Sequence, residues 1–396
     1  MTLENSFIPY GGYWTTPFSR WQGSLSAYHS IELAGRVGRS FLESRKIPPA
    51  TFDGMVLGIT VPQRHAFYGA PWLASMLGAE DITGPTVSQA CATSARAIAS
   101  AALEIETRQR ECILAVGCDR TSNGPHIYYP DPDGPGGQGS FEDPVLGNMN
   151  LDPHAGLAMV QTAENLAAEA GITREEQDSV ALLRYTQYQN ALEADRSFQK
   201  KYMVDVELLR RKKVIGVVEA DEGVHETTAE GLAGLRPVAE GGTVTFGTQT
   251  HPADGNAGMI VCSEERAAEL SRKPVTIRLR SYGEARVEKG FMPKAVVPAA
   301  RHALERAGIG INECAAVKTH NPFAVADVFF CREMGITPTD VNNYGSPLIW
   351  GHPQAPTGLR AIIELIEELV IIGGGYGLFS GCAGGDTSMA AVVEVG

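Results

Sequence analysis

Two separate stretches of this chain alternate short apolar runs with helix-like patterns, and this alternation limits the fold more than any other feature. In the first, about residues 1–120, a buried strand is predicted at 54–60, a helix at 91–108 and the next strand at 112–117. Short apolar runs bounded by turn residues are typical of buried strands, and their alternation with helices is typical of βα units. The sequence therefore predicts an α/β fold.

The same alternation resumes from about residue 243. The elements predicted there are strands at 243–247, 259–263 and 274–282, helices at 296–307 and 356–370, and a terminal hairpin of 376–380 with 388–395. The most apolar segment, 362–372, is interrupted by Glu364, Glu367 and Glu368, which predicts an amphipathic helix.

The middle block opens with a loop at 129–139 that is rich in Pro, Gly and Asp. Two helices are predicted after it, one near Thr162 and one after Thr173, because Thr173 and Glu176 have the spacing of a capping box. The basic run from Arg210 to Lys213 is interpreted either as a solvated face or as a site for a phosphate-bearing ligand.

Two similar α/β halves with a central insertion are the economical architecture for this pattern. We expect residues 1–120 plus 243–268 to form the N-terminal half, residues 121–242 a loop domain, and residues 269–396 the C-terminal half.

Charge and cysteine usage exclude several classes of function. The 396 residues carry 33 Lys and Arg against 46 Asp and Glu, a formal net charge of −13, which disfavours nucleic acid or an anionic membrane as the main partner. The sequence shows neither a membrane-spanning apolar run nor the pattern of a secretory signal. The seven cysteines form no CxxC pair, which disfavours a zinc site or a disulfide framework and predicts reduced, cytoplasmic thiols.

Cys91 is the first candidate for chemistry. It follows a strand-like segment at 85–88 and lies at the first turn of the helix predicted at 91–108. The partial positive charge and free amides of a helix N-terminus favour a thiolate over a thiol. A lone cysteine is more often a small buried apolar side chain, so a nucleophilic role for Cys91 depends on its neighbours.

Two histidines occupy positions typical of catalytic loops. His320 lies in the segment 319–323, directly after the strand-like segment 315–318, and ligands of α/β sheets gather at strand ends. His352 lies between Gly351 and Pro353, which impose an irregular backbone. Either histidine alone could be a structural side chain, but two of them with a candidate nucleophile favour catalysis.

Cys382 lies in the Gly-rich segment SGCAGG at 380–385, which predicts a tight turn. Exposed amides in such a turn could serve as an oxyanion hole. The alternative interpretation is a turn that contains an incidental cysteine.

Together these four residues resemble the thiolase superfamily, and the resemblance covers nearly the whole chain. The matching segments are SQACATSARA at 88–97 (nucleophile segment), Gly351 to Pro353 (GHP motif), Cys382 to Gly384 (CxG motif), Thr162 to Asn165, and Asp254 with Gly255. Any one match is weak, but their order and spacing together are specific. The resemblance implies a thiolase fold of two αβαβα five-layered halves with a central loop domain, assembled at least as a dimer.

Three departures from the common thiolase pattern bear on the substrate. The segment HNPF at 320–323 stands where many thiolases have NEAF, which puts His320 in the place of the asparagine, as in the sterol-carrier-protein-type thiolases. Ala158 falls where many acetoacetyl-type enzymes have a histidine. Thr250 stands where a serine is expected beside the pantetheine arm, and His251 follows it in place of the usual glycine.

The resemblance implies an acyltransferase that uses coenzyme A as co-substrate, with no tightly bound cofactor and no metal. Cys91 would attack the 3-oxo carbon of a 3-oxoacyl-CoA while His352 takes its proton, and Cys382 would act as a second acid and base. His320 would stabilise the thioester enolate. The backbone amides of Cys91 and Gly384 would hold the other oxyanion.

The departures lead us to expect a bulky, branched or aromatic substrate, with benzoylsuccinyl-CoA as one candidate. Thr250, His251, Arg210 and Lys213 are the expected contacts to the substrate and coenzyme A, the basic pair at its 3′-phosphate. Some similar thiolases work with a small OB-fold/zinc-ribbon subunit, so a heteromer is also expected.

Two other functions fit parts of the pattern. A β-ketoacyl synthase-like condensing enzyme resembles thiolases in fold and in its Cys–His site, but decarboxylative condensation needs no second thiol such as Cys382. A silent thiolase-fold subunit that acts as a scaffold has no need to keep all four reactive residues. The sequence leaves open whether the reaction runs as thiolysis or as Claisen condensation.

Overall fold

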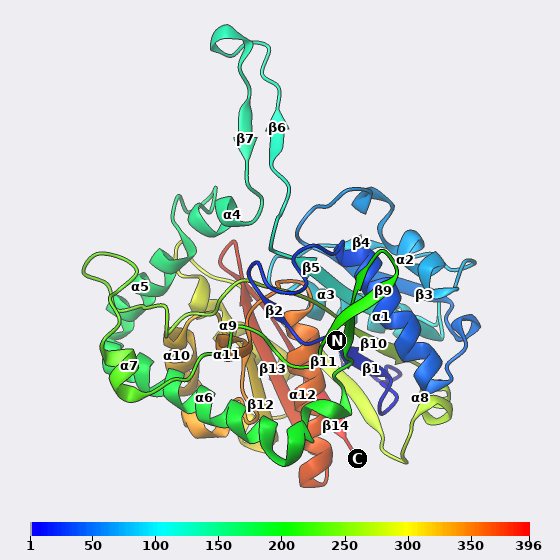
Figure 1. The fold of residues 1–396 in the computed structure, drawn as a ribbon. Coiled ribbons are helices and arrows are strands. Elements are labelled where there is room, and N and C mark those ends of the chain that lie inside the picture. The colour runs from blue at the N-terminus through cyan, green and yellow to red at the C-terminus, as the bar shows by residue number, and fades with distance from the viewer. Residues whose placement is uncertain (1) are drawn as a thin grey trace.

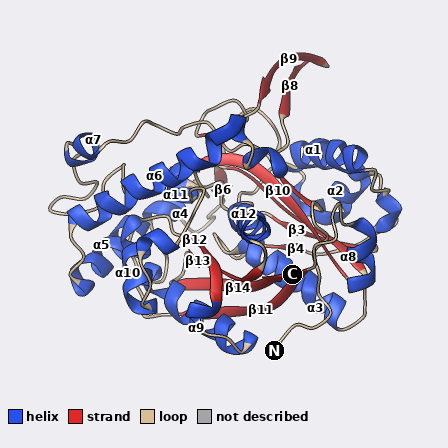
Figure 2. Ribbon diagram, turned by 90° about the horizontal axis from the view of Figure 1, so that it is seen from below, coloured by secondary structure: helices blue, strands red, loops and turns tan. Residues whose placement is uncertain are grey.

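The computed structural model describes residues 2–396, and its core is built on two β-sheets with two helices between them (Figures 1 and 2). The strands of the first sheet, in spatial order, are β1 (Tyr13–Thr15), β10 (Ala253–Cys262), β5 (Cys112–Arg120), β3 (Gly54–Gly58) and β4 (Thr86–Val87), and β2 (Ser19–Arg20) pairs with β10. Strand β3 is parallel to β4 and β5, whereas β10 is antiparallel to β5 and β1.

The second sheet contains the four strands β11 (Ile277–Arg286), β14 (Thr387–Val395), β13 (Gly375–Ala383) and β12 (Cys314–His320), in that order. Strands β13 and β14 form the terminal hairpin that the sequence predicts, with longer strands than expected. Strand β12 is parallel to β13, so the carboxyl ends of these two strands meet at one edge of the sheet.

Helices α3 (Thr93–Glu106) and α12 (Thr357–Ile372) lie between the sheets, where α3 packs on β3 and β5 and α12 packs on β12 and β13. Helices α1 (Ser30–Arg45), α2 (Gly69–Leu77) and α8 (Glu264–Leu270) pack against the first sheet from outside. Helix α9 (Val296–Ala307) covers the outer face of the second sheet, with α10 (Ala324–Met334) beside it. The helix–sheet alternation of the sequence therefore corresponds to five layers (Figure 2).

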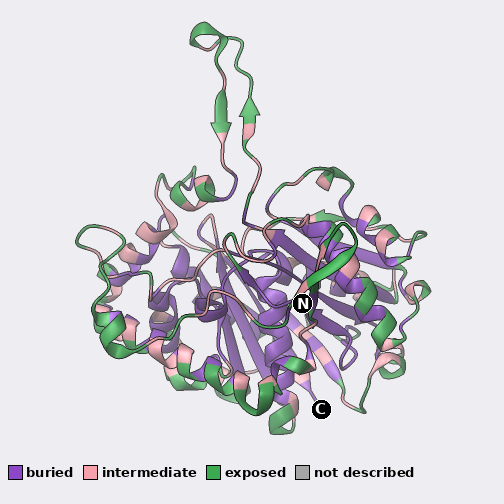
Figure 3. Cartoon of the chain, in the orientation of Figure 1, coloured by how far each residue is buried: buried purple, intermediate pink, exposed green. Residues whose placement is uncertain are grey.

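Helix α12 is buried along most of its length (Figure 3). It is not the amphipathic helix that its glutamates predict, because all three of them are buried. Each has polar partners: Glu364 bonds to Lys318 and Arg360, Glu367 accepts from Tyr13, and Glu368 accepts from Asn343. A helix between two sheets has no solvent face, so its carboxylates need such partners to offset their desolvation. The sequence pattern alone cannot distinguish this case from a surface helix.

The middle block wraps around one end of the sheets and also forms two projecting hairpins, one seen in Figure 1 (β6–β7) and the other in Figure 2 (β8–β9). Its elements are β6 (Ile127–Tyr129), β7 (Ser140–Glu142), α4 (Leu146–Asn150), α5 (Met159–Ala170), α6 (Arg174–Arg196), β8 (Val206–Arg210), β9 (Lys213–Val218) and α7 (Ala229–Ala233). Helix α6 begins with the predicted capping box of Thr173 and Glu176. The domain boundaries at 120/121, 242/243 and 268/269 stay predictions.

The strand predicted at 243–247 is wrong. There Thr245 makes only an isolated bridge to Pro237, and the Thr248 hydroxyl accepts the Thr245 amide, so a local turn replaces the strand. Among residues 2–396, no helix is both long and apolar enough to cross a membrane.

Candidate active site

Cys91 lies in the short connection between β4 and α3, at the junction of the two sheets. Helix α3 begins at Thr93, two residues beyond Cys91, so the thiol precedes the helix and does not lie in its first turn as predicted. The preceding Ala90 has a left-handed backbone, with φ of +43°. This strained turn is the kind of backbone that often positions a reactive side chain.

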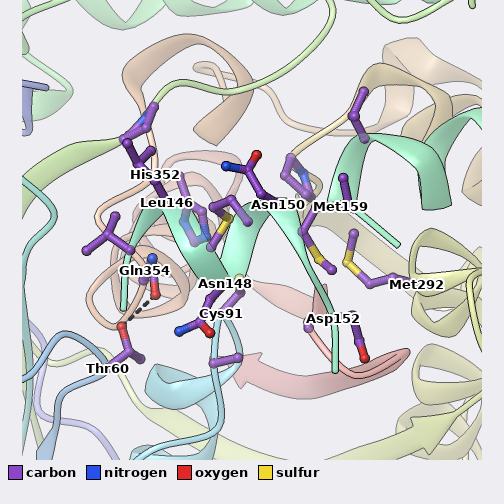
Figure 4. A pocket seen from close by; sticks show the side chains of 18 of the residues that line it. Thr60, Cys91, Leu146, Asn148, Asn150, Asp152, Met159, Met292, His352 and Gln354 are labelled. Atoms are coloured by element: carbon purple, nitrogen blue, oxygen red, sulfur yellow. Dashed lines mark hydrogen bonds between the residues drawn. The ribbon is translucent and has the colours of Figure 1, made fainter. Parts of the chain in front are cut away.

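The structure brings Cys91, His320 and His352 together, although they are far apart in the sequence. The Sγ atom of Cys91 and one ring nitrogen of each histidine all lie within 4.8 Å of one another. The two imidazole rings have centroids 4.2 Å apart with their planes 36° from each other. Figure 4 shows Cys91 and His352 in the cavity that they share.

The ring of His352 is oriented by its neighbours. Its backbone N–H donates to the carbonyl of His251 at 2.9 Å, and Nδ1 lies 2.7 Å from the Thr357 hydroxyl. The other nitrogen, Nε2, is buried and has no hydrogen-bond partner among residues 2–396. A neutral imidazole that donates from Nδ1 to Thr357 presents the lone pair of Nε2, which a general base requires.

His320 ends strand β12 and is 1% exposed, with both ring nitrogens unpartnered within residues 2–396. The next residue, Asn321, turns away from the site and donates to the carboxylate of Asp327 at 2.5 Å. The imidazole of position 320, and not the amide of position 321, is therefore the polar group beside Cys91, as the alignment on Phe323 predicts.

Cys382 lies at the end of strand β13, paired with Ser388, and not in the predicted tight turn, which begins two residues later at Gly384. Its thiol is 0% exposed and donates to the carbonyl of His320 at 3.9 Å. Burial raises the pKa of the Cys382 thiol well above its usual value, and the nearby Cys91 raises it further.

The resting site is electrically neutral. Burial raises the pKa of Cys91 to about 11, although the amides of Gly384 and of Cys91 itself partly oppose this by stabilising a thiolate. Burial lowers the pKa of His320 to about 3 and that of His352 well below its usual range. Desolvation thus outweighs the two amides and opposes the expected preference of a helix N-terminus for a thiolate.

A cavity of about 490 Å³ opens on Cys91, His352 and Gly384. Its apolar wall is formed by Val145, Leu146, Met149, Leu151, Met159, Val160, Val238, Met292 and Phe323. Its polar lining includes Thr60, Ser88, Asn148, Asn150, Asp152, Gln249, Thr250 and Gln354 (Figure 4). The short helix α4 contributes to both walls.

Of the expected substrate contacts, only Thr250 lines this cavity. The side chain of His251 lies behind it, against Gly223 and Gly351, and the residue contributes its carbonyl to the His352 loop. Arg210 and Lys213 flank the turn of the β8–β9 hairpin and are exposed, away from the lining of the cavity. Thiolate and imidazole are also zinc ligands, and Cys91, His320 and His352 form the one cluster in residues 2–396 with spacing suited to a metal ion.

Several residues that organise the site are not indicated by the sequence pattern: Thr357, Asp119, Thr60 and Gln354. Asp119 accepts hydrogen bonds from the amides of Thr60, Val61 and Ala355, and so connects the end of β3 to the His352 loop. The only available signal was their position after strands or beside the GHP motif, which does not show their contacts.

Known proteins share this fold over nearly the whole chain. The family model for the thiolase N-terminal domain matches residues 13–265 and that for the thiolase C-terminal domain matches residues 273–395. The chain is 30% identical to beta-ketothiolase BktB of Cupriavidus necator and 29% identical to acetyl-CoA acetyltransferase of Escherichia coli, with 96% of each chain covered. It superposes on human mitochondrial 3-ketoacyl-CoA thiolase in complex with CoA with a TM-score of 0.90, at 27% identity over 100% of this chain and 99% of that one.

The mixed α/β fold, the cysteine–histidine site and these relatives together identify the protein as an acyltransferase. The chain belongs to the thiolase family. The human mitochondrial 3-ketoacyl-CoA thiolase on which the chain superposes has CoA bound.

Proposed function

We propose that this thiolase cleaves a bulky, branched or aromatic 3-oxoacyl-CoA with coenzyme A, through an acyl-enzyme on Cys91. The observation that carries the proposal is the trio of Cys91, His320 and His352, whose reactive atoms all lie within 4.8 Å of one another. A thiol beside an oriented imidazole is the arrangement that nucleophilic catalysis needs.

In the first half-reaction, Sγ of Cys91 attacks the 3-oxo carbon while Nε2 of His352 accepts the thiol proton. Proton transfer accompanies the attack, because both groups are neutral at rest. The oxyanion that forms on the former ketone oxygen accepts hydrogen bonds from the backbone N–H groups of Cys91 and Gly384. Each such donor typically stabilises the transition state by about 3–4 kcal/mol. When the oxyanion collapses, the Cα–Cβ bond breaks and leaves an acyl group on Cys91.

The electron pair of the broken bond moves onto the departing acyl-CoA unit as a thioester enolate. His320 stabilises the enolate oxygen, and the Cys382 thiol donates a proton to its α-carbon. In the second half-reaction, the Cys382 thiolate takes the proton of a new coenzyme A. The resulting thiolate attacks the acyl-Cys91 thioester, the shortened acyl-CoA departs, and Cys91 recovers its proton from His352.

The size and lining of the cavity support a bulky acyl group. Met149, Met159 and Met292 line its apolar wall, and methionine side chains adapt to irregular apolar shapes. Ala158, which stands where a histidine is usual in acetoacetyl-type enzymes, also lines the cavity and leaves room there. The histidine at position 320 makes the sterol-carrier-protein-type thiolases the proposed subgroup, with benzoylsuccinyl-CoA as one candidate substrate.

A short-chain substrate is the second candidate, because several relatives are acetyl-CoA acetyltransferases. Steady-state thiolysis of acetoacetyl-CoA and of branched and aromatic 3-oxoacyl-CoAs separates the two. We expect the larger substrates to have the higher kcat/KM. A preference for acetoacetyl-CoA over all larger substrates would overturn the proposed substrate class.

The nucleophile is tested independently of the substrate. Cys91→Ser should lower thiolysis by about 10⁴-fold or more, as loss of a catalytic nucleophile does elsewhere. Iodoacetamide followed by mass spectrometry should label Cys91 in the wild type, with protection by acyl-CoA. Unprotected labelling together with full activity of Cys91→Ser would rule out the acyl-enzyme.

Assembly as at least a dimer is part of the proposal. Strand β4, which leads into Cys91, is an edge strand with one unpaired side, and such edges are usually covered in native proteins. An additional small OB-fold/zinc-ribbon subunit is proposed from the sequence resemblance alone. Sedimentation of the purified chain measures whether it forms a dimer. Co-purification from the native source shows whether the additional subunit binds.

A further inference from the structure

One corner of the cavity is polar, in contrast to its methionine-rich wall. Thr60 and Gln354 both line the cavity there, and the Thr60 hydroxyl lies 2.6 Å from the Gln354 side-chain amide (Figure 4). Gln354 has a φ of +59°, a left-handed conformation that costs free energy for any residue with a Cβ. The chain therefore holds a long polar side chain at a strained position, two residues after His352.

The hydrogen-bond pattern leaves half of the Gln354 amide free. The Thr60 hydroxyl is also 2.6 Å from Oδ2 of Asp119, and it has only one proton to donate. If that proton goes to the Asp119 carboxylate, the amide group that faces Thr60 must be the NH₂, and the Gln354 carbonyl faces the cavity. If Asp119 is protonated, the carbonyl faces Thr60 and the NH₂ faces the cavity.

In both arrangements, one polar group of Gln354 has no partner among residues 2–396 and remains open to the cavity. A purely hydrocarbon substrate that covered this group would remove its water without replacing the hydrogen bond, which is unfavourable. A hydroxyl group fits either arrangement, because it can donate to the carbonyl or accept from the NH₂.

The charges around the corner exclude a carboxylate as the preferred group. No lysine or arginine of residues 2–396 lines the cavity, whereas the carboxyl groups of Asp119 and Asp152 lie beside or within it. An anionic group on the substrate would lose its hydration without gaining a cationic partner.

We propose that Gln354, oriented by Thr60 and Asp119, determines specificity by binding a hydroxyl group on the acyl part of the substrate. The inference rests on the proposed thiolase function and narrows its substrate class to bulky, uncharged acyl groups with a hydroxyl. It therefore disfavours benzoylsuccinyl-CoA, whose acyl group carries a carboxylate, within that class. It makes Gln354 a binding residue, and Thr60 and Asp119 positioning residues that act through it.

The test uses three matched aromatic 3-oxoacyl-CoAs that differ only in a ring substituent: hydrogen, hydroxyl or carboxylate. For the wild-type enzyme we expect kcat/KM to be about tenfold higher for the hydroxyl compound than for the unsubstituted one, and lowest for the carboxylate. In Gln354→Met, which conserves volume but removes the hydrogen bond, the hydroxyl-to-hydrogen ratio should fall to about one.

Gln249→Met is the matched control, because Gln249 also lines the cavity but has no contact with Thr60. It should keep the wild-type ratio. Thermal melting shows whether Gln354→Met is folded. If it is not, Thr60→Val tests the same inference, because an untethered Gln354 should reduce the ratio by several-fold.

The possible outcomes distinguish failure of this inference from failure of the proposed thiolase function. A wild-type enzyme that cleaves the compounds without preferring the hydroxyl, or a ratio that survives both Gln354→Met and Thr60→Val, overturns the role of Gln354 and leaves the thiolase function intact. Preference for the carboxylate overturns the uncharged class. Failure to cleave any 3-oxoacyl-CoA contradicts the proposed function itself.

Discussion

Cys91 and Cys382 lie in the same site but come from opposite halves of the chain and have different surroundings. Cys91 precedes a helix, lines the cavity, and has the amides of Gly384 and of its own residue near its sulfur. Cys382 is part of strand β13, is 0% exposed, and has the His320 carbonyl as its hydrogen-bond partner. The open, amide-supported thiol suits a nucleophile, and the enclosed thiol suits proton transfer.

In the absence of substrate, both thiols keep their protons. Burial raises the pKa of Cys91 to about 11 and that of Cys382 well above its usual value. The two amides near Cys91 are therefore of most use when negative charge develops on the substrate oxygen during the reaction, and not in preparing a stable thiolate. Activation must then coincide with substrate binding.

Alkylation of Cys91 at different pH values gives the largest expected effect. Because only the thiolate reacts, the rate with iodoacetamide should rise about tenfold per pH unit, or about 10³-fold between about pH 7 and about pH 10, without a plateau below the pKa of about 11. Mass spectrometry of the Cys91 peptide measures this rate. A rate that is already maximal near neutral pH would show a resting thiolate–imidazolium pair and would contradict the neutral site.

Removal of the second thiol separates proton transfer from nucleophilic attack. Cys382→Ser should lower kcat for thiolysis by about 10²–10³-fold, because a serine hydroxyl is a much weaker acid than a thiol at this position. Alkylation of Cys91 should continue in this variant. Cys314→Ser, at the partly exposed start of β12, is the control and should retain activity. If Cys382→Ser instead abolished Cys91 labelling, the division of roles between the two thiols would be wrong.

The sequence could predict which residues react but not their protonation states. The motifs around Cys91, His320, His352 and Cys382 identify the reactive residues because their chemistry needs those residue types. The protonation state of Cys91 depends on desolvation by residues distant in sequence, so a local rule about helix N-termini gives the wrong sign.

The same limit applies to the fold. Helix α9 is predicted with the bounds that the structure has, because its pattern is local. The burial of Glu364, Glu367 and Glu368 in α12 depends on Lys318, Arg360 and other partners that fold against the helix from both sides. Periodicity contains no information about those partners, and for this reason it predicts an amphipathic helix and not one with buried carboxylates.

A smaller effect is expected from the residue that orients the base. Thr357→Val removes the hydroxyl 2.7 Å from Nδ1 of His352 while nearly conserving the shape of the side chain. We expect kcat to fall about tenfold, the usual value of one such hydrogen bond, with little change in KM. Thr107→Val, which removes an exposed threonine hydroxyl just after α3, is the matched control. Equal activity of the two variants would show that Thr357 does not position His352.

The smallest effect concerns the β8–β9 hairpin, which lies outside the cavity. The turn of this hairpin is exposed and carries basic side chains, whereas the cavity is lined by apolar and uncharged polar residues and one aspartate. Arg210 and Lys213 flank a two-residue turn whose residues, Arg211 and Lys212, have φ values of 48° and 68°. Such a turn favours Asn and Gly, yet here it consists of basic residues in a chain of net charge −13. We propose that this basic turn binds the 3′-phosphate of coenzyme A. When the thiol of coenzyme A lies at Cys91, the nucleotide end of the molecule extends beyond the cavity.

The double variant Arg210→Glu with Lys213→Glu should raise the KM for coenzyme A by several-fold, without a change in kcat, because the reversed charges repel the phosphate. Dephospho-coenzyme A, which lacks the 3′-phosphate, should show the same KM with the variant and the wild type. Increasing salt should reduce the difference seen with coenzyme A, since both charges are exposed to solvent. An unchanged KM for coenzyme A at low salt would assign the basic turn to the solvated surface and remove it from the binding site.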